Sequence, residues 1–360
     1  MEKFILNLVS CSLLMTLVSF FLMLLFRPLK SIQSAKGRYY SWILVFIGYL
    51  IVFKPSFGEG VVRIDTDSLL NNASAETGTE ALCLNITTIY FTVFLIWVCG
   101  VVASLSKAYF QQLFFKRSIT RTAVPAAAKI INILDEVTDE LMIWEDIRAI
   151  SSEAVATPMI VGFFKPVIIL PVRDMTNNEL RLILKHELIH FKHRDLYFKA
   201  FMIFVKSVHW FNPFIGFFMR RAEQECEIYC DEDVMRGEGT ASRKLYCQSI
   251  LNALKTGEDK AIIYPSGNPA VSSNFFNGKS GLKLRMKMIL SNGKKHKLVF
   301  LCVITAAVLV IFSGTVLAFS VGDDKHEDAL AVQTSVYNFF EGSSVVLYEA
   351  SVTTSLGSLF

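Results

Sequence analysis

The amino-acid sequence predicts a mainly α membrane protein with four transmembrane helices and an inserted α+β domain. Of its 360 residues, 52% are hydrophobic and 19% are charged, whereas soluble domains carry about 25% charged residues. The apolar residues gather in long stretches, and basic residues are unevenly divided among the connections between them. These three observations predict that much of the chain lies in a bilayer, and they exclude a disordered or collagen-like protein.

Four stretches are apolar enough for transmembrane helices, which need about 20 apolar residues each. They comprise residues 4–26, 39–53, 89–105 and 298–319. The second is the shortest and relies on its aromatic flanks to reach both interfaces. The first is too long for a secretory signal peptide and lacks a small-residue cleavage site, so we expect it to be retained as a helix.

Basic residues predict the orientation, because cytoplasmic connections carry an excess of Lys and Arg. The connection after the first span has four basic residues and no acidic one, the connection at 54–87 has two basic residues, and lysines precede the fourth span. We therefore expect a multi-pass protein of the cell membrane with both termini extracellular. It has three transmembrane helices in 1–106, an outer loop at 54–87, a cytoplasmic domain at 107–297, a fourth transmembrane helix at 298–320 and a short extracellular tail at 321–360.

The predicted cytoplasmic domain combines helices with a few strands. Amphipathic spacing predicts helices at 129–141, 177–192, 223–235, 242–254 and 282–290, and β-prone runs predict strands at 144–150 and 159–170. The second strand is a candidate edge on which an extended peptide substrate lies by β-augmentation. The segment at 266–279 is rich in Ser, Asn and Gly and is expected to be an exposed loop.

The motif with the clearest chemistry is His186-Glu187-Leu188-Ile189-His190, an H-E-x-x-H sequence inside the predicted helix at 177–192. Residues four apart lie on one face of a helix, so His186 and His190 are placed to share one metal ion. Glu187 is the candidate general base that takes a proton from metal-activated water. The motif predicts one catalytic zinc ion per chain.

A catalytic zinc ion needs a third protein ligand and an open position. Glu227 is the candidate ligand, and Asp231, four residues later on the same helical face, is expected to orient a ligand histidine. Glu223 lies on this face too and is the alternative ligand.

The apolar segment at 196–219 bears on this pairing. If it crossed the bilayer, the histidines and Glu227 would lie on opposite sides, about 30 Å apart. Asn212-Pro213 interrupts the segment, and the break predicts a helical hairpin that returns Glu227 to the histidines.

Other polar residues near the motif have less definite roles. Asp195 is expected to hold the end of the motif helix and to support the site from behind the ligands. His193 is expected at a solvated helix end rather than at the metal. His209 and Tyr229 are both candidates for stabilising the oxyanion, and the sequence does not choose between them.

The seven cysteines are scattered and odd in number, which does not indicate a disulfide framework. Cys226 and Cys230 are four residues apart on a predicted helix. We expect them to be small core residues, with metal or redox use as the alternative.

These features together resemble the BlaR/MecR-type sensor-transducers, which are membrane gluzincins of Gram-positive bacteria. The resemblance is carried by Pro158-Met-Ile-Val-Gly-Phe-Phe-Lys-Pro166, His186-Glu-Leu-Ile-His190-Phe-Lys-His-Arg-Asp195, His209-Trp-Phe-Asn-Pro213 and Glu227-Ile-Tyr-Cys-Asp231. It implies a gluzincin-type zinc metallopeptidase domain. In the family pattern His186, His190 and Glu227 hold zinc and Glu187 is the base.

In that family an extracellular penicillin-binding sensor follows the last span, and its acylation activates a protease that cleaves itself and promotes loss of a DNA-bound repressor. The resemblance implies self-cleavage in the loop before the fourth span, near Asn274 and Phe275. About forty residues follow that span, too few for a penicillin-binding fold. We therefore expect a family member without this sensor or a truncated gene, and no direct sensing of β-lactams.

We predict an integral-membrane zinc endopeptidase in signal transduction that cleaves itself, a cytoplasmic transcriptional regulator, or both. The alternatives are an HtpX-like quality-control protease and a catalytically silent receptor or scaffold that keeps the zinc site for stability. The expected partners are membrane lipid and a peptide or protein substrate such as a cytoplasmic repressor, and the resemblance suggests a homodimer. The sequence has no helix-turn-helix pattern or basic stripe that would predict direct binding of nucleic acid.

Overall fold

The computed structural model describes residues 2–29, 34–51, 86–155, 157–260 and 278–291, together with positions 304 and 307. All of them belong to one of the two compact units into which the chain divides, the unit of Met1–Phe57 and Cys83–Gly314. The outer loop at 54–87, the fourth span, the tail at 321–360 and the cleavage site at Asn274 and Phe275 lie wholly or mostly outside the described residues. The structure predicted for these segments stays a prediction.

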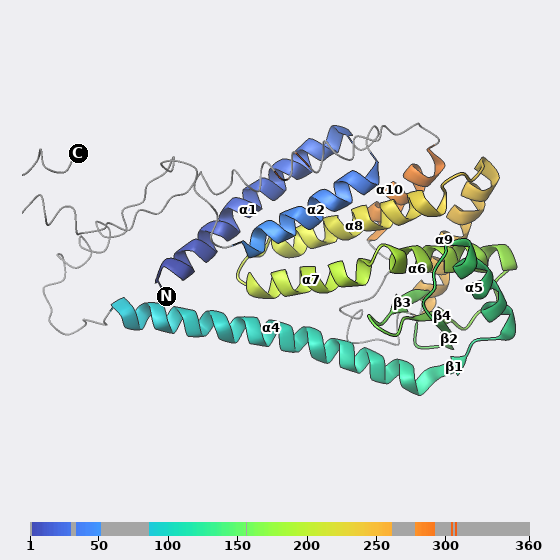
Figure 1. Cartoon of the computed structure of the whole chain (residues 1–360), viewed down its shortest axis with the longest axis horizontal. Helices are drawn as coiled ribbons and strands as arrows, with labels where there is room; N and C mark the ends of the chain where they lie inside the picture. Colours follow the sequence, from blue (N-terminus) through green and yellow to red (C-terminus); the bar gives the residue numbers. More distant parts are fainter. Residues whose placement is uncertain are drawn as a thin grey trace, which may run out of the picture. The chain divides into compact units, whose positions relative to one another are not determined.

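Three apolar helices, α1 (Glu2–Leu29), α2 (Ala35–Leu50) and α4 (Ile86–Thr122), contain most of the first three predicted spans (Figure 1). Among the described residues, two helical segments are long and apolar enough to cross a membrane, Phe4–Phe26 and Thr88–Thr122. The 16 residues of α2 are fewer than the roughly 20 of a typical span. The number of spans and their orientation therefore remain predictions.

Helix α4 extends well beyond the predicted third span. It runs for 37 residues without interruption, so the predicted span and the beginning of the predicted cytoplasmic domain form one helix. Its most apolar window has 0% of its residues buried, whereas the window in α1 is 50% buried. A long apolar helix with its surface exposed is typical of a lipid-facing element rather than of the core of a soluble domain.

The segment after the motif helix forms the predicted hairpin, which confirms the break at Asn212-Pro213. Helix α7 (Asp195–Val208) and helix α8 (Ile215–Val234) are its two arms. At the tip, the side-chain amide of Asn212 donates to Ser12 Oγ at 2.9 Å and to Thr16 Oγ1 at 2.8 Å, both on α1. The hairpin therefore packs against the apolar helices, with one aromatic and aliphatic core shared by α1, α2, α7 and α8.

A small sheet lies beside the motif helix. Its strands are β1 (Ala123–Pro125), β2 (Arg148–Ser152), β3 (Met159–Val161) and β4 (Val167–Pro171), in the order β1-β2-β4-β3. Strand β2 is antiparallel to β1 and parallel to β4, and β3 is antiparallel to β4. Strand β3 is thus an edge of the described sheet, where its outer backbone groups have no neighbouring strand.

Both strand predictions need correction. The first strand begins at Arg148 rather than at 144, and Trp144 is 91% exposed. The predicted strand at 159–170 is two strands joined by a turn at Gly162, whose φ is +95°. A Cβ at Gly162 would lie 2.4 Å from the carbonyl oxygen of Lys165, so the turn requires glycine.

The motif helix is α6 (Asn177–Lys192), exactly the predicted residues 177–192. Thr176 caps it by accepting a hydrogen bond from the backbone N–H of Glu179, which is part of a T-x-x-E capping pattern. One side of α6 packs its leucines and isoleucines against the sheet and helix α5 (Ala128–Glu140). Its histidine-bearing side faces α8, so the amphipathic pattern fixes where the motif points.

Helices α9 (Thr240–Lys260) and α10 (Gly278–Leu290) complete the described fold. Both contact residues of α6 and α8 through a small core that includes Ile189, Cys230, Tyr246 and Ile289. These two helices flank the segment at 261–277 in the chain, and each contributes a side chain to the site described next.

Candidate metal centre

His186, His190 and Glu227 come together between α6 and α8. The Nε2 atoms of the two histidines are 3.0 Å apart. Glu227 Oε2 lies 3.5 Å from Nε2 of His186, and Glu227 Oε1 lies 3.5 Å from Nε2 of His190. All three residues are buried, and their ligand atoms lie within 4.8 Å of one another. Two nitrogens and one carboxylate are a donor set that zinc hydrolases use.

The outer nitrogen of His190 is held by Asp195, the first residue of α7. Nδ1 of His190 lies 2.7 Å from Asp195 Oδ2, and the other carboxylate oxygen accepts a hydrogen bond of 2.6 Å from the Tyr39 hydroxyl. Arg194, in the left-handed conformation with φ of 59°, makes the sharp turn that brings Asp195 back beside the motif. Asp195 therefore does more than hold the helix end, because it fixes the orientation of a candidate ligand.

The outer nitrogen of His186 is held by a chain of three residues. Nδ1 of His186 lies 2.7 Å from the Tyr246 hydroxyl, which donates to Asp231 Oδ1 at 2.8 Å. Arg285 donates two hydrogen bonds to the same carboxylate, of 2.7 Å and 2.8 Å. Asp231 thus orients His186 mainly through Tyr246, since its own nearest oxygen is 3.5 Å from the ring.

Glu227 is also fixed from behind, by Arg285. The Nη1 atom of Arg285 lies 3.0 Å from Glu227 Oε2. Burial raises the pKa of Glu227, but the charges of Arg285 and His190 outweigh burial and hold that pKa well below its usual value. Burial likewise lowers the pKa of His190, yet the Glu227 charge and the hydrogen bond to Asp195 raise it well above its usual value.

The electrostatics of Glu227 and His190 therefore favour a cation. The lowered pKa keeps Glu227 an anion although it is buried, and a metal cation would take the place of the proton that His190 attracts.

Glu187 lies next to His186 on α6 and is fully buried. Glu223, the alternative ligand, lies one turn before Glu227 on α8. Burial and the charge of Glu227 raise the pKa of Glu223, although the charge of Lys199 acts in the opposite direction. Among the described residues, the cluster with both motif histidines contains Glu227 and not Glu223.

Three predicted polar residues lie elsewhere. His193 does not lie at a solvated helix end: only 11% of its side chain is exposed, and it pairs with Asp233 at 2.9 Å and stacks on Tyr229 at 4.1 Å between ring centroids. Tyr229, one of the two candidates for stabilising the oxyanion, is thus engaged in stacking with His193. The other, His209, lies at the far end of α7, where its Nε2 is 2.9 Å from the Tyr49 carbonyl oxygen.

Sequence reasoning missed Tyr246 and Arg285. The signal for Arg285 was present in the sequence, because Arg285 lies at helical spacing between Leu282 and Ile289. An arginine on an apolar stripe indicates a buried partner of opposite charge. Tyr246 and Tyr39 gave no comparable signal, since a buried tyrosine is an ordinary core residue.

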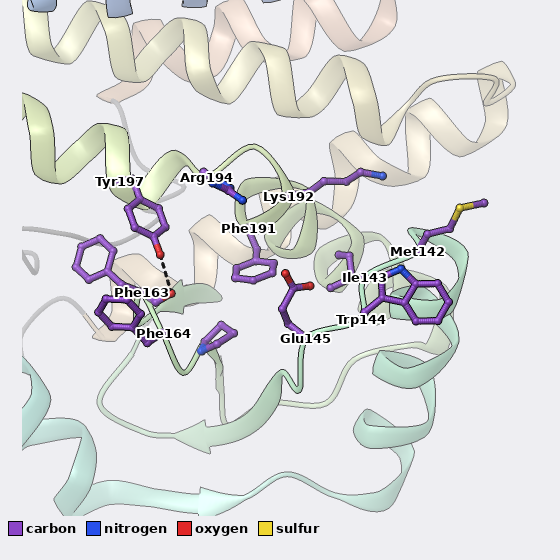
Figure 2. A pocket seen from close by; sticks show the side chains of 11 residues that line it. Met142, Ile143, Trp144, Glu145, Phe163, Phe164, Phe191, Lys192, Arg194 and Tyr197 are labelled. Atoms are coloured by element: carbon purple, nitrogen blue, oxygen red, sulfur yellow. Dashed lines mark hydrogen bonds between the residues drawn. The ribbon is translucent and has the colours of Figure 1, made fainter.

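A cavity of about 480 Å³ opens near the end of α6. Figure 2 shows Phe163, Phe164, Trp144, Phe191 and Tyr197 around it, and the hydroxyl of Tyr197 donates to the Phe163 carbonyl at 3.0 Å. Phe163 and Phe164 belong to the turn that directly follows edge strand β3. The cavity is therefore lined in part by the turn that leaves the edge strand, and five of its lining side chains are aromatic.

Comparison with known proteins identifies the family of this chain and several relatives. A family model described as BlaR1 peptidase M56 matches residues 6–289. The methicillin resistance mecR1 protein of Staphylococcus aureus is 23% identical over 384 residues, which cover 98% of this chain and 63% of that protein. The regulatory protein BlaR1 of Staphylococcus aureus is 25% identical over 349 residues, covering 88% of this chain and 58% of that protein.

The regulatory protein BlaR1 of Bacillus licheniformis is 26% identical over 155 residues, covering 42% of this chain and 25% of that protein. The chain thus spans less than two thirds of the length of each of these relatives. The family match, in contrast, includes the motif helix, Glu227, Asp231, Tyr246 and Arg285. The chain therefore belongs to the BlaR1 peptidase M56 family of metallopeptidases.

Proposed function

We propose that this chain is an integral-membrane zinc endopeptidase of signal transduction, which cleaves itself, a cytoplasmic transcriptional regulator, or both. The observation that carries the proposal is the convergence of His186, His190 and Glu227, with Glu187 beside them. Family membership supports peptide hydrolysis. The names of the relatives, a regulatory protein and a methicillin resistance protein, support a role in a regulated response.

The donor set fits zinc. Bond lengths of zinc to nitrogen and oxygen place tetrahedral ligand atoms about 3.3 Å apart, and the separations here are 3.0 Å and 3.5 Å. Hydrogen bonds hold the Nδ1 atoms, which leaves both Nε2 atoms facing the same point. When bound, the ion would polarise the scissile carbonyl and lower the pKa of the attacking water.

Glu187 acts as the general base and then as the general acid. Its carboxylate follows the first ligand histidine on α6 and is removed from bulk solvent. In this position it takes the proton from the attacking water and passes it to the amine that leaves. Exclusion of bulk water strengthens the hydrogen bonds that the carboxylate makes during proton transfer, because no hydration shell competes for it.

Edge strand β3 is where we place the peptide substrate. The strand packs against α6 and lies at the edge of the described sheet, and an extended peptide can join the edge of a sheet through backbone hydrogen bonds. The aromatic cavity at its end, of about 480 Å³, suits a large apolar side chain of that substrate. Trp144 and Phe164 at its rim are 91% and 93% exposed, as expected of surfaces that await a partner.

Self-cleavage near Asn274 and Phe275 is supported by the helices on either side. Tyr246 on α9 and Arg285 on α10 both reach the metal centre. Position 275 precedes α10 by three residues, and Arg285 follows the first residue of α10 by about 10 Å of helix. The first residue of α10, which follows position 275 by three residues, is therefore only about 10 Å of helix from a residue of the site.

The membrane location rests on α1 and α4, and the topology remains as predicted from charge. With both termini outside, the metal centre lies on the cytoplasmic side, where a transcriptional repressor is accessible. We propose lipid and such a regulator as partners, and a homodimer as the assembly.

The proposal is tested with the full chain in membranes, comparing wild type, Glu187→Gln and the exposed control Glu153→Gln. The measurements are zinc per chain and cleavage, both of the chain itself and of a synthetic peptide with the sequence of residues 266–282. We expect about one zinc in all three proteins and cleavage in wild type and Glu153→Gln alone. Equal cleavage by Glu187→Gln would contradict the assigned base. Zinc without cleavage in any of them would favour the receptor or scaffold alternative.

A further inference from the structure

A second group of potential metal ligands adjoins the first and shares one residue with it. His190, Asp195, Cys226 and Cys230 are all buried, and one ligand atom from each lies within 4.8 Å of the others. The sulfur of Cys230 lies 3.2 Å from Nδ1 of His190 and 3.3 Å from Asp195 Oδ2. Those two atoms are themselves 2.7 Å apart.

We propose that Cys226, Cys230, Asp195 and Nδ1 of His190 form a second metal site, which takes a thiophilic divalent ion and excludes the ion at the first site. The inhibitory consequence rests on the proposed peptidase function. The site itself does not, because it follows from the arrangement of the four side chains.

The donor set is suited to such an ion. Two thiolates, one imidazole and one carboxylate match the tetrahedral sulfur-rich sites that bind zinc, and cadmium prefers sulfur more strongly. Tetrahedral bonds to these donors put the ligand atoms roughly 3.3–3.8 Å apart. The separations of 3.2 Å and 3.3 Å around Cys230 are close to this range. Nδ1 of His190 and Oδ2 of Asp195, at 2.7 Å, must move apart by about 0.6 Å to reach it.

Ordinary core packing does not explain the cluster. It accounts for two buried cysteines, but not for a carboxylate and an imidazole nitrogen at hydrogen-bond distance from one sulfur. A metal ion that binds here displaces the thiol protons to solvent.

The two sites cannot be occupied together, because each requires a different tautomer of His190. At the first site the ring binds through Nε2 and carries its proton on Nδ1, which donates to Asp195. At the second site the ring binds through Nδ1, so the proton must move to Nε2. A neutral imidazole offers one lone pair, and therefore His190 serves one ion at a time.

The first zinc ion is expected at the histidine–glutamate site, because the second site must first lose two thiol protons. An excess of thiophilic ion reverses this preference. His193 gives such an ion an entry, since it is 11% exposed and its Nδ1 lies 3.6 Å from the Cys230 sulfur. Once the second ion binds His190, the zinc ion at the first site has only two protein ligands left, and it therefore dissociates.

The experiment adds cadmium to the zinc-loaded full chain in detergent. It records the thiolate-to-cadmium absorption band and zinc release to an indicator dye. The proteins are wild type, the double variant Cys226→Ser/Cys230→Ser, and Cys247→Ser as the control for a buried cysteine on α9. We expect wild type and Cys247→Ser to develop the band and to release about one zinc per cadmium bound. The double variant should do neither, while keeping its zinc and its cleavage activity.

Three results would overturn the proposal. The band would persist in the double variant if other thiols bound the cadmium. Wild type would show no band if the four residues were only a packed cluster. Zinc release would be equal in wild type and the double variant if the two sites did not share His190. Zinc content before cadmium is added reports the folding of each variant, and the single variant Cys230→Ser replaces the double variant if that one does not fold.

Discussion

Replacing Tyr246 with phenylalanine tests how the chain prepares its metal centre. The substitution removes one oxygen, which lies 2.7 Å from Nδ1 of His186 and 2.8 Å from Asp231. In the metal-free protein the imidazole can carry its proton on Nε2, toward Glu227, and lose little. Zinc ligation through Nε2 forces the proton onto Nδ1, where the nearest carboxylate oxygen left in the variant, Asp231 Oδ1, is 3.5 Å away and too distant for a good hydrogen bond.

The cost therefore falls on the zinc-bound state. A buried donor left without a partner costs about 1–3 kcal/mol, which corresponds to a loss of about 10- to 100-fold in zinc affinity at 1.4 kcal/mol per factor of ten. Losses of the same size are typical when a residue that orients a metal-bound histidine is removed. Asp231 keeps both hydrogen bonds from Arg285, so the fold should survive.

The assay is competition for zinc between the full chain in detergent and a chelating dye of known affinity. Tyr197→Phe is the control, because its hydroxyl bonds a backbone carbonyl in the β3–β4 turn and should leave the zinc Kd unchanged. A Kd for Tyr246→Phe within two-fold of wild type would refute the reasoning that this hydroxyl fixes the tautomer of His186.

Three further changes have outcomes that the structure predicts. Arg285→Met removes the positive charge that pairs with two buried carboxylates and should lower the unfolding free energy of the zinc-free protein by about 3–5 kcal/mol. Arg181→Met, in two exposed ion pairs, should lower it by about 0–1 kcal/mol; urea unfolding measures both. Gly162→Ala should lower the Tm and weaken peptide cleavage, because its Cβ would meet a backbone oxygen at 2.4 Å. Gly237→Ala, also at positive φ but with open space, should lower the Tm less. The hydrogen bond from Lys185 and the charges of Lys185 and Arg181 lower the pKa of Glu140, so its contribution to stability is present at neutral pH and lost as the pH falls through that lowered pKa. Glu140→Gln should therefore reduce stability at neutral pH and have little effect in acid.

The motif helix was predictable because its information is local. A capping pattern, a run of apolar residues at helical spacing and two histidines four apart all lie within 176–192. The hairpin was predictable for the same reason, since Asn212-Pro213 interrupts a helix regardless of the surroundings. The pairing of Glu227 with the histidines then followed from topology rather than from any contact visible in the sequence.

What was missed depends on distant parts of the chain. Tyr246 meets His186 across 60 positions, and Arg285 meets Asp231 across 54. No local pattern indicates the partner of Tyr246, and helical spacing places Arg285 on an apolar stripe without identifying Asp231 as its partner. The strand at 159–170 failed for a different reason, because β-prone apolar residues continue on both sides of a tight turn in which Gly162 has a positive φ.

The central claim is that His186, His190 and Glu227 hold the catalytic zinc, and zinc-edge X-ray absorption of the full chain at one zinc equivalent tests it most directly. We predict a first shell of nitrogen and oxygen with two imidazoles in wild type, and a weakened, altered shell in Glu227→Gln. Sulfur in the wild-type shell, or fewer than two imidazoles, would contradict the claim.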